Sequence, residues 1–63
     1  MIYRYFYENT GEIVAKAQFQ GTLDNPGKCM VVYSDTFIDT DQDVNPDQYL
    51  VDLTTNTLVA KSQ

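Results

Sequence analysis

The chain begins with a segment that reads as a β-hairpin, Ile2-Tyr3-Arg4-Tyr5-Phe6-Tyr7-Glu8-Asn9-Thr10-Gly11-Glu12-Ile13-Val14-Ala15-Lys16-Ala17. Aromatic and β-branched residues, which favour strands, fill two runs, and a turn that ends in Gly11 separates these runs. A type I turn closed by a left-handed glycine is a common hairpin connection, and here it sets Glu8 opposite Glu12. The segment therefore predicts a hairpin over residues 2–20, which is the starting point for assigning the other elements.

The turn also predicts which residues face each other across this hairpin. Counting outward from it gives the pairs Tyr7–Ile13, Tyr5–Ala15 and Tyr3–Ala17. The three tyrosines then share one face with small or branched aliphatic side chains, and we assign this face to the core. The opposite face carries Phe6 and Val14, with Arg4 beside Lys16. A slip of one residue would move every tyrosine to the other face, so the register depends on the turn.

Length and composition restrict the chain to one small domain, residues 1–63. Cys29 is the single cysteine, which excludes an internal disulfide, and without histidine the chain has no common zinc site. Small domains that lack a disulfide and a structural metal often gain stability by oligomerisation or by docking on a larger partner. We therefore expect the chain to associate with itself or with another protein.

The charge of the chain narrows the choice of partners. The formal net charge is −5, from nine acidic and four basic residues. Phosphate contacts need clustered Lys and Arg, so we expect no binding to nucleic acid or to a membrane surface. No apolar run approaches the length of a membrane span, and the first residues lack the basic-then-apolar layout of a signal peptide. A lone cysteine is typical of a protein made in a reducing cytoplasm.

The second half of the chain predicts a further strand, a loop and another hairpin. The central strand, residues 29–34, begins with the apolar run Cys29-Met30-Val31-Val32-Tyr33, whose length and β-branching favour burial on both sides. An acidic loop over residues 39–47 follows, and Asn45-Pro46 leaves room there for no more than a turn of helix. Residues 48–61 then form the second hairpin, with Asn56 at the left-handed position of its turn.

Together these elements predict an all-β fold. It is a small antiparallel sheet or meander of about five short strands, in which two β-hairpins flank a central strand. The two hairpins resemble each other, because aligning Thr10 with Thr55 also aligns Val14 with Val59. An internal repeat and independent convergence on good hairpin residues both account for this match.

Two features could carry chemistry, and neither meets the requirements. The segment 39–43 has the aspartate spacing with which a calcium loop starts, but Val44 replaces the required glycine and Leu50 the required glutamate. Cys29 has no histidine to activate it as a nucleophile. We therefore predict no catalytic residues, no metal site and no cofactor, and we expect that the protein is not an enzyme.

An apolar face opposite the tyrosines is the candidate functional surface. A sheet made from so short a chain has too little material to cover both of its sides, so one apolar face is expected to contact neighbouring subunits. The predicted interface residues are Phe6, Val14, Tyr49, Val51 and Val59. Exposed strand edges offer a further route of association, by joining the sheet of a partner.

Both hairpins resemble known modules. The residues Tyr5-Phe6-Tyr7-Glu8-Asn9-Thr10-Gly11-Glu12-Ile13-Val14 are similar to the aromatic hairpin that opens many small virion proteins and fibre-terminal modules of tailed bacteriophages. The closing hairpin of such modules resembles Pro46-Asp47-Gln48-Tyr49-Leu50-Val51-Asp52-Leu53-Thr54 with Leu58-Val59, although Asn56 stands where those modules often have glycine. The resemblance covers a little over half of the chain.

This resemblance implies a structural part of the virion: a tail or tail-fibre component, or a capsid decoration protein, acting through protein–protein contacts. It implies as partners a larger virion structural protein, further copies of the same chain, or both, and it implies a location in the virion after synthesis in the host cytoplasm. Two other classes of function stay open. One is a small acidic inhibitor or DNA mimic that binds a basic host enzyme, and the other is a sugar- or peptide-binding module.

Overall fold

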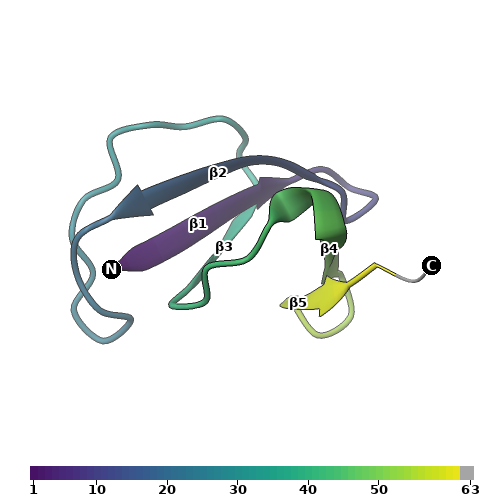
Figure 1. Ribbon diagram of the computed structural model, residues 1–63. Coiled ribbons are helices and arrows are strands. Elements are labelled where there is room, and N and C mark those ends of the chain that lie inside the picture. The colour runs from purple at the N-terminus through teal and green to yellow at the C-terminus, as the bar shows by residue number, and fades with distance from the viewer. Residues whose placement is uncertain (62–63) are drawn as a thin grey trace.

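A computed structural model of the chain, which describes residues 1–61, shows an almost entirely β fold with two small antiparallel sheets (Figure 1). The larger sheet has the order β2-β1-β3, and its strands are β1 (Ile2–Tyr7), β2 (Ile13–Phe19) and β3 (Phe37–Thr40). The smaller sheet pairs β4 (Tyr49–Asp52) with β5 (Thr57–Ala60), and a short 3-10 turn, Pro46–Gln48, precedes it. The predicted all-β class, the five short strands and the two hairpins are confirmed.

A strand does lie between the two hairpins in the sequence, but its predicted position is wrong. Residues 29–34 form no strand but lie in the loop that connects β2 with β3, and β1 is the middle strand of the larger sheet. The third strand is β3, whose last two residues belong to the predicted acidic loop 39–47. Specific side-chain pairs place β3 beside β1. Phe37 lies opposite Phe6, and Asp39 lies opposite Arg4, with which it forms an ion pair.

The first hairpin has the predicted turn but only part of the predicted register. Gly11 has φ +88°, and its amide donates to the Glu8 carbonyl at 2.8 Å, as expected for the left-handed glycine of this turn. Tyr7 pairs with Ile13 as predicted. The register then shifts, because Val14 is an extra residue that forms a β-bulge.

The bulge changes which residues of β2 face the tyrosines. Beyond it, Phe6 pairs with Ala15 and Tyr5 pairs with Lys16, so the expected pairs Tyr5–Ala15 and Tyr3–Ala17 are wrong. Lys16 therefore lies on the tyrosine face. Its ammonium is 5.2 Å from the ring centroid of Tyr3.

Both faces of β1 are covered, although we expected so short a chain to leave one face of its sheet exposed. Tyr5 on one face and Phe6 on the other are each fully buried. The loop after β3 covers Tyr5, and the rings of Tyr33 and Phe37 pack edge-on against Phe6. Tyr33, from the loop that was predicted to be a strand, thus helps to bury Phe6. The buried hydrophobic residues are Ile2, Tyr5, Phe6, Tyr7, Phe19 and Val51.

The two sheets meet at the turn of the first hairpin. The Val51 amide donates to the Gly11 carbonyl at 2.8 Å, and Glu12 forms a β-bridge with Leu50. Lys61 also forms an ion pair with Glu12, with 3.2 Å between Nζ and Oε1. A side chain at position 11 would collide with this joint, since its Cβ would lie 2.4 Å from the Val51 carbonyl oxygen.

The turn of the second hairpin also has a left-handed residue at its last position. Asn56 has φ +56°, and its amide donates to the Asp52 carbonyl at 2.7 Å. Asparagine tolerates this conformation better than most residues with a side chain. The predicted role of Asn56 in the turn is confirmed.

Candidate interaction surface

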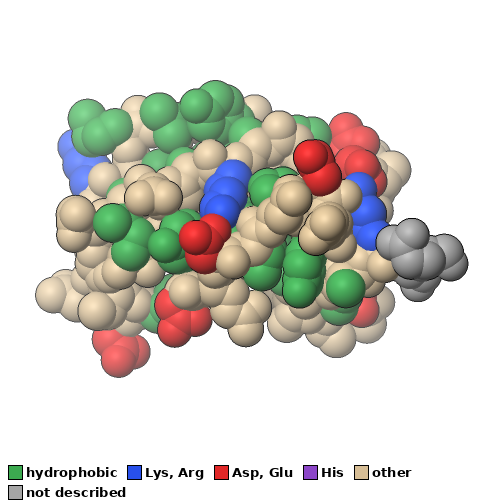
Figure 2. Space-filling view, in the orientation of Figure 1, with side chains coloured by type: hydrophobic (Ala, Val, Ile, Leu, Met, Phe, Trp, Pro, Cys, Tyr) green, Lys and Arg blue, Asp and Glu red, His purple; other side chains and the backbone are tan. Residues whose placement is uncertain are grey.

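The most exposed hydrophobic residues of the described chain lie in one segment, residues 29–33, which we call the apolar segment. Met30 is 80% exposed and Val32 is 77% exposed, whereas Val31 is only 40% exposed. Figure 1 shows the loop that contains this segment arching past β2 before it returns to β3, and Figure 2 shows hydrophobic side chains along the same side of the molecule. Because apolar residues gather here in sequence, this is a continuous surface feature rather than scattered single residues.

The exposure alternates along the apolar segment as it does in a strand. Cys29 is partly buried and Val31 is 40% exposed, whereas Met30 and Val32 on either side of Val31 are more exposed; Tyr33, at the end of the segment, is 61% exposed. Successive side chains of an extended chain point to opposite sides, so the segment has a strand-like outer face without belonging to a sheet.

Both ends of this loop are fixed to the larger sheet. On one side the Gly27 amide donates to the Gln20 carbonyl at 2.9 Å. On the other side the Tyr33 ring lies 5.3 Å from the Phe6 ring, edge to face, and the Ser34 hydroxyl donates to the Tyr7 carbonyl at 3.4 Å. The segment is therefore held in place at its ends while its middle is presented to solvent.

The backbone of the apolar segment is unpaired. Within residues 1–61, no backbone–backbone hydrogen bond involves residues 28–35, and the only contact to the Val31 carbonyl is a weak hydrogen bond from the Cys29 thiol at 3.4 Å. Peptide groups that are not paired in the protein are available to a partner strand. The segment combines free peptide groups with exposed β-branched and apolar side chains, which is the chemistry of strand addition.

The basic residues are distributed so that one of them flanks this segment. Arg4 pairs with Asp39 through two hydrogen bonds of 2.7 and 2.9 Å, and this contact raises the pKa of Arg4. A hydrogen bond from Lys16 to Asp43 likewise raises the pKa of Lys16. Lys28, beside the apolar segment, makes no ion pair within the described residues.

The predicted interface residues do not come together into one surface. Phe6 and Val51 are buried, 0% and 1% exposed, so they cannot contact a partner, and this part of the prediction is wrong. Tyr49 and Val59 are partly buried in the smaller sheet, whereas Val14 is exposed at the bulge of β2. The prediction failed for Phe6 because Tyr33 of the apolar segment packs against it, and Val51 lies in β4 where that strand joins the Gly11 turn.

Met30 and Val32 were missed as surface residues for a related reason. A short apolar run has the same sequence pattern whether it is a buried strand or an exposed loop. The one signal in the sequence for an exposed loop is that charged residues limit the run, because Lys28 precedes it and Asp35 follows soon after it.

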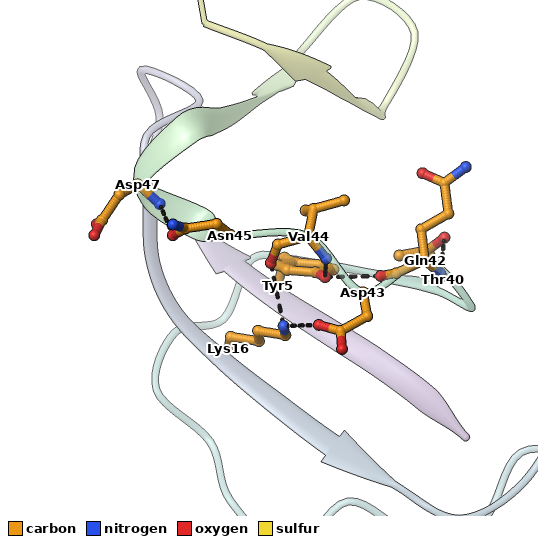
Figure 3. Close-up of polar contacts among 8 residues, drawn as sticks. All are labelled: Tyr5, Lys16, Thr40, Gln42, Asp43, Val44, Asn45 and Asp47. Atoms are coloured by element: carbon orange, nitrogen blue, oxygen red, sulfur yellow. Dashed lines mark hydrogen bonds and ion pairs between the residues drawn. The ribbon is translucent and has the colours of Figure 1, made fainter.

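The acidic loop is held against the tyrosine face by hydrogen bonds to its backbone (Figure 3). The Tyr5 hydroxyl donates to the Gln42 carbonyl at 2.7 Å and accepts from the Val44 amide at 2.9 Å. Lys16 contacts Asp43 and also donates to the Val44 carbonyl at 3.1 Å. A buried phenol and a lysine thus fix the conformation of this loop.

Two carboxylates of the loop are engaged with bases. Asp39 contacts Arg4 and Asp43 contacts Lys16, so the aspartates of the segment 39–43 point to different partners. Among residues 1–61 no three acidic, histidine or cysteine side chains are close enough to hold a metal ion. At Asp47 it is the backbone amide that bonds locally, donating to the Asn45 side chain at 3.0 Å.

Replacing Tyr5 with phenylalanine tests this loop contact. The change leaves the Gln42 carbonyl and the Val44 amide without their partner, and we expect the free energy of unfolding to fall by about 1–3 kcal/mol. Tyr3→Phe is the matched control, because Tyr3 lies on the same face and its hydroxyl bonds to no residue within 1–61. Denaturant titration of both variants measures the difference, and equal losses would contradict the proposed role of the Tyr5 hydroxyl.

The described residues form no pocket and include no helix that is long and apolar enough to cross a membrane. Comparisons with protein-family models, with curated proteins and with solved structures give no match.

Proposed function

We propose that the chain is a non-enzymatic structural or accessory protein of a tailed-phage virion, made in the host cytoplasm and acting through protein–protein contacts. The observation that carries the proposal is the apolar segment, whose Met30 and Val32 are exposed on a backbone that makes no backbone–backbone hydrogen bond within residues 1–61. A small protein that presents such a segment at a fixed place is suited to occupy a site on an assembly. The similarity of both hairpins to phage modules supplies the virion context.

The distribution of acidic residues favours this role over that of a DNA mimic. A mimic needs free carboxylates spread over one face, to take the place of phosphates at a basic site. Here three of the nine acidic residues, Glu12, Asp39 and Asp43, are each engaged by a base of the same chain. A mimic would also leave the exposed Met30 and Val32 without a role.

Co-purification with particles tests the proposed function. Phage particles are purified from the producing culture, and the chain is quantified in the particle fraction against the free fraction. We expect a fixed number of copies per particle that survives washing in high salt, because apolar contacts are not screened by ions. A chain that is recovered only in the free fraction would overturn the proposal.

A double variant, Met30→Ser with Val32→Ser, tests whether the apolar segment is the contact. Both side chains are mostly exposed, so we expect stability within about 0.5 kcal/mol of the native chain and at least about a tenfold loss from the particle fraction. The matched control is Leu23→Ser, which removes an exposed leucine outside the segment and is expected to leave binding unchanged. Equal retention of the double variant and the control would place the contact elsewhere.

A further inference from the structure

Lys28 is the basic residue of the described chain that lies in an exposed loop. Arg4 and Lys16 lie within β1 and β2, and each forms an ion pair with an aspartate. Lys61 follows β5 and forms an ion pair with Glu12. Lys28 is instead exposed, lies outside every strand and forms no ion pair within residues 1–61. Its side chain is therefore available to an enzyme that recognises a basic residue.

The backbone that follows Lys28 can leave the protein surface at low cost. An endopeptidase draws several consecutive residues into its active site, so it cuts exposed loops much more readily than paired strands. Residues 28–35 form no backbone–backbone hydrogen bond in the described part of the chain. Before Lys28, the nearest backbone hydrogen bond is the one from the Gly27 amide to the Gln20 carbonyl. The peptide bond between Lys28 and Cys29 can thus be reached without separating two paired strands.

The ion pairs of the chain join the residues before this bond to those after it. A cut after Lys28 would divide the chain into residues 1–28, which contain β1 and β2, and residues 29–63, which contain β3, β4 and β5. β3 pairs with β1 along its whole length. The three ion pairs within residues 1–61 each join one piece to the other: Arg4 with Asp39, Lys16 with Asp43, and Lys61 with Glu12.

The core also depends on both pieces. Phe6 of the first piece is fully buried, and the rings of Tyr33 and Phe37 of the second piece pack against it. Between the two sheets, the Val51 amide donates to the Gly11 carbonyl at 2.8 Å. Opening a loop removes none of these contacts, because loop closure acts on the entropy of the chain. We therefore expect a break in this loop to leave the folded structure in place.

We propose that the peptide bond between Lys28 and Cys29 is a cleavage site for an endopeptidase that cuts after basic residues, and that the two products stay together as one folded complex. The step consumes one water molecule: the amide C–N bond breaks, Lys28 gains a carboxylate and Cys29 gains an ammonium group. The inference goes beyond the proposed function and does not depend on it, because it uses only contacts within this chain. After the cut the apolar segment begins at a chain end, and Tyr33 still anchors its other end on Phe6.

Limited digestion of the native chain with trypsin, followed by mass spectrometry, tests the site. We expect the first internal cut after Lys28, because cleavage follows the population of the open form and Arg4 and Lys16 lie in paired strands. A cut after Lys61 removes only the last two residues and is recognised by its mass. Lys28→Gln is expected to slow internal cleavage at least about tenfold, whereas Lys28→Arg keeps the site. A first internal cut elsewhere, or equal rates for the native chain and Lys28→Gln, would overturn the proposal.

Size-exclusion chromatography of the cut protein tests whether the products stay together. We expect both pieces to elute at the volume of the uncut chain and to separate in denaturant. Phe6→Leu, cut in the same way, is expected to raise the dissociation constant of the two pieces at least about tenfold, because Phe6 packs on rings of the other piece. Leu23→Ser is the matched control, since Leu23 is exposed, and should leave this constant unchanged. Pieces that separate in native buffer would overturn the association, and equal constants for the two variants would overturn its dependence on the core.

Discussion

Replacing Gly11 with alanine is expected to lower the free energy of unfolding by about 2–4 kcal/mol and to release the second hairpin from the first sheet. Three effects act together at this position. The backbone has φ +88°, which costs an alanine about 1–2 kcal/mol. The new Cβ would lie 2.4 Å from the Val51 carbonyl oxygen, so the backbone has to move. That movement weakens the hydrogen bond from the Val51 amide to the Gly11 carbonyl, now 2.8 Å long.

The loss is large relative to the stability of so small a domain. A chain of this length has a typical free energy of unfolding of about 3–9 kcal/mol. The sheet of β4 and β5 is a two-stranded hairpin, and such hairpins are marginal when isolated. We therefore expect amide hydrogen exchange in β4 and β5 to accelerate more than in β1 and β2, because the joint at Gly11 fails before the larger sheet does.

The matched control for this prediction is Asn56→Ala. Asn56 is exposed and also left-handed, with φ +56°, so this variant measures the backbone cost of a left-handed alanine alone, expected at about 1 kcal/mol. The excess loss in Gly11→Ala then combines the greater freedom of glycine in this conformation with the close approach to Val51. If both variants lose the same stability and exchange in β4 and β5 stays slow, the joint does not depend on Gly11.

The parts of the fold that could be predicted are those that neighbouring residues determine. Gly11 and Asn56 identify the two turns because few other residues adopt a left-handed conformation at low cost. The bulge at Val14 was not predictable, since small apolar residues at positions 15 and 17 fit either register. The contacts that suit the observed register, such as Lys16 with Asp43, join residues far apart in the sequence.

The sequence shows the apolar residues of the candidate site but does not show that they are exposed. The apolar run at residues 29–33 is plain in the sequence, but local pattern alone assigns it to a buried strand. The place of a third strand is instead taken by β3, where Arg4 binds Asp39 and Phe6 packs on Phe37. Those long-range pairs leave the apolar run outside the sheet, and they also bury Phe6, which the sequence had placed at an interface.

Replacing Phe6 with alanine is expected to lower the free energy of unfolding by about 3–5 kcal/mol, enough to unfold much of the population. Phe6 is fully buried, and its ring packs edge-on against Tyr33 at 5.3 Å and Phe37 at 5.8 Å. Truncation leaves a cavity between β1 and the apolar segment, and Tyr33 loses the ring that holds this segment in place. Thermal unfolding followed by circular dichroism measures the effect.

Because Phe6→Ala can abolish folding, Phe6→Leu provides the quantitative test. It keeps most of the buried volume, so we expect a loss of about 1–2 kcal/mol with the fold retained. Phe37→Leu is the matched control, since Phe37 is the partner ring but is 41% exposed, and its loss should be smaller. The double variant completes a cycle in which a coupling of about 0.5–1.5 kcal/mol is expected for an aromatic pair. If Phe6→Leu costs no more than Phe37→Leu, Phe6 is not the buried anchor of the apolar segment, and other contacts, such as that of the Ser34 hydroxyl with the Tyr7 carbonyl, must hold the segment.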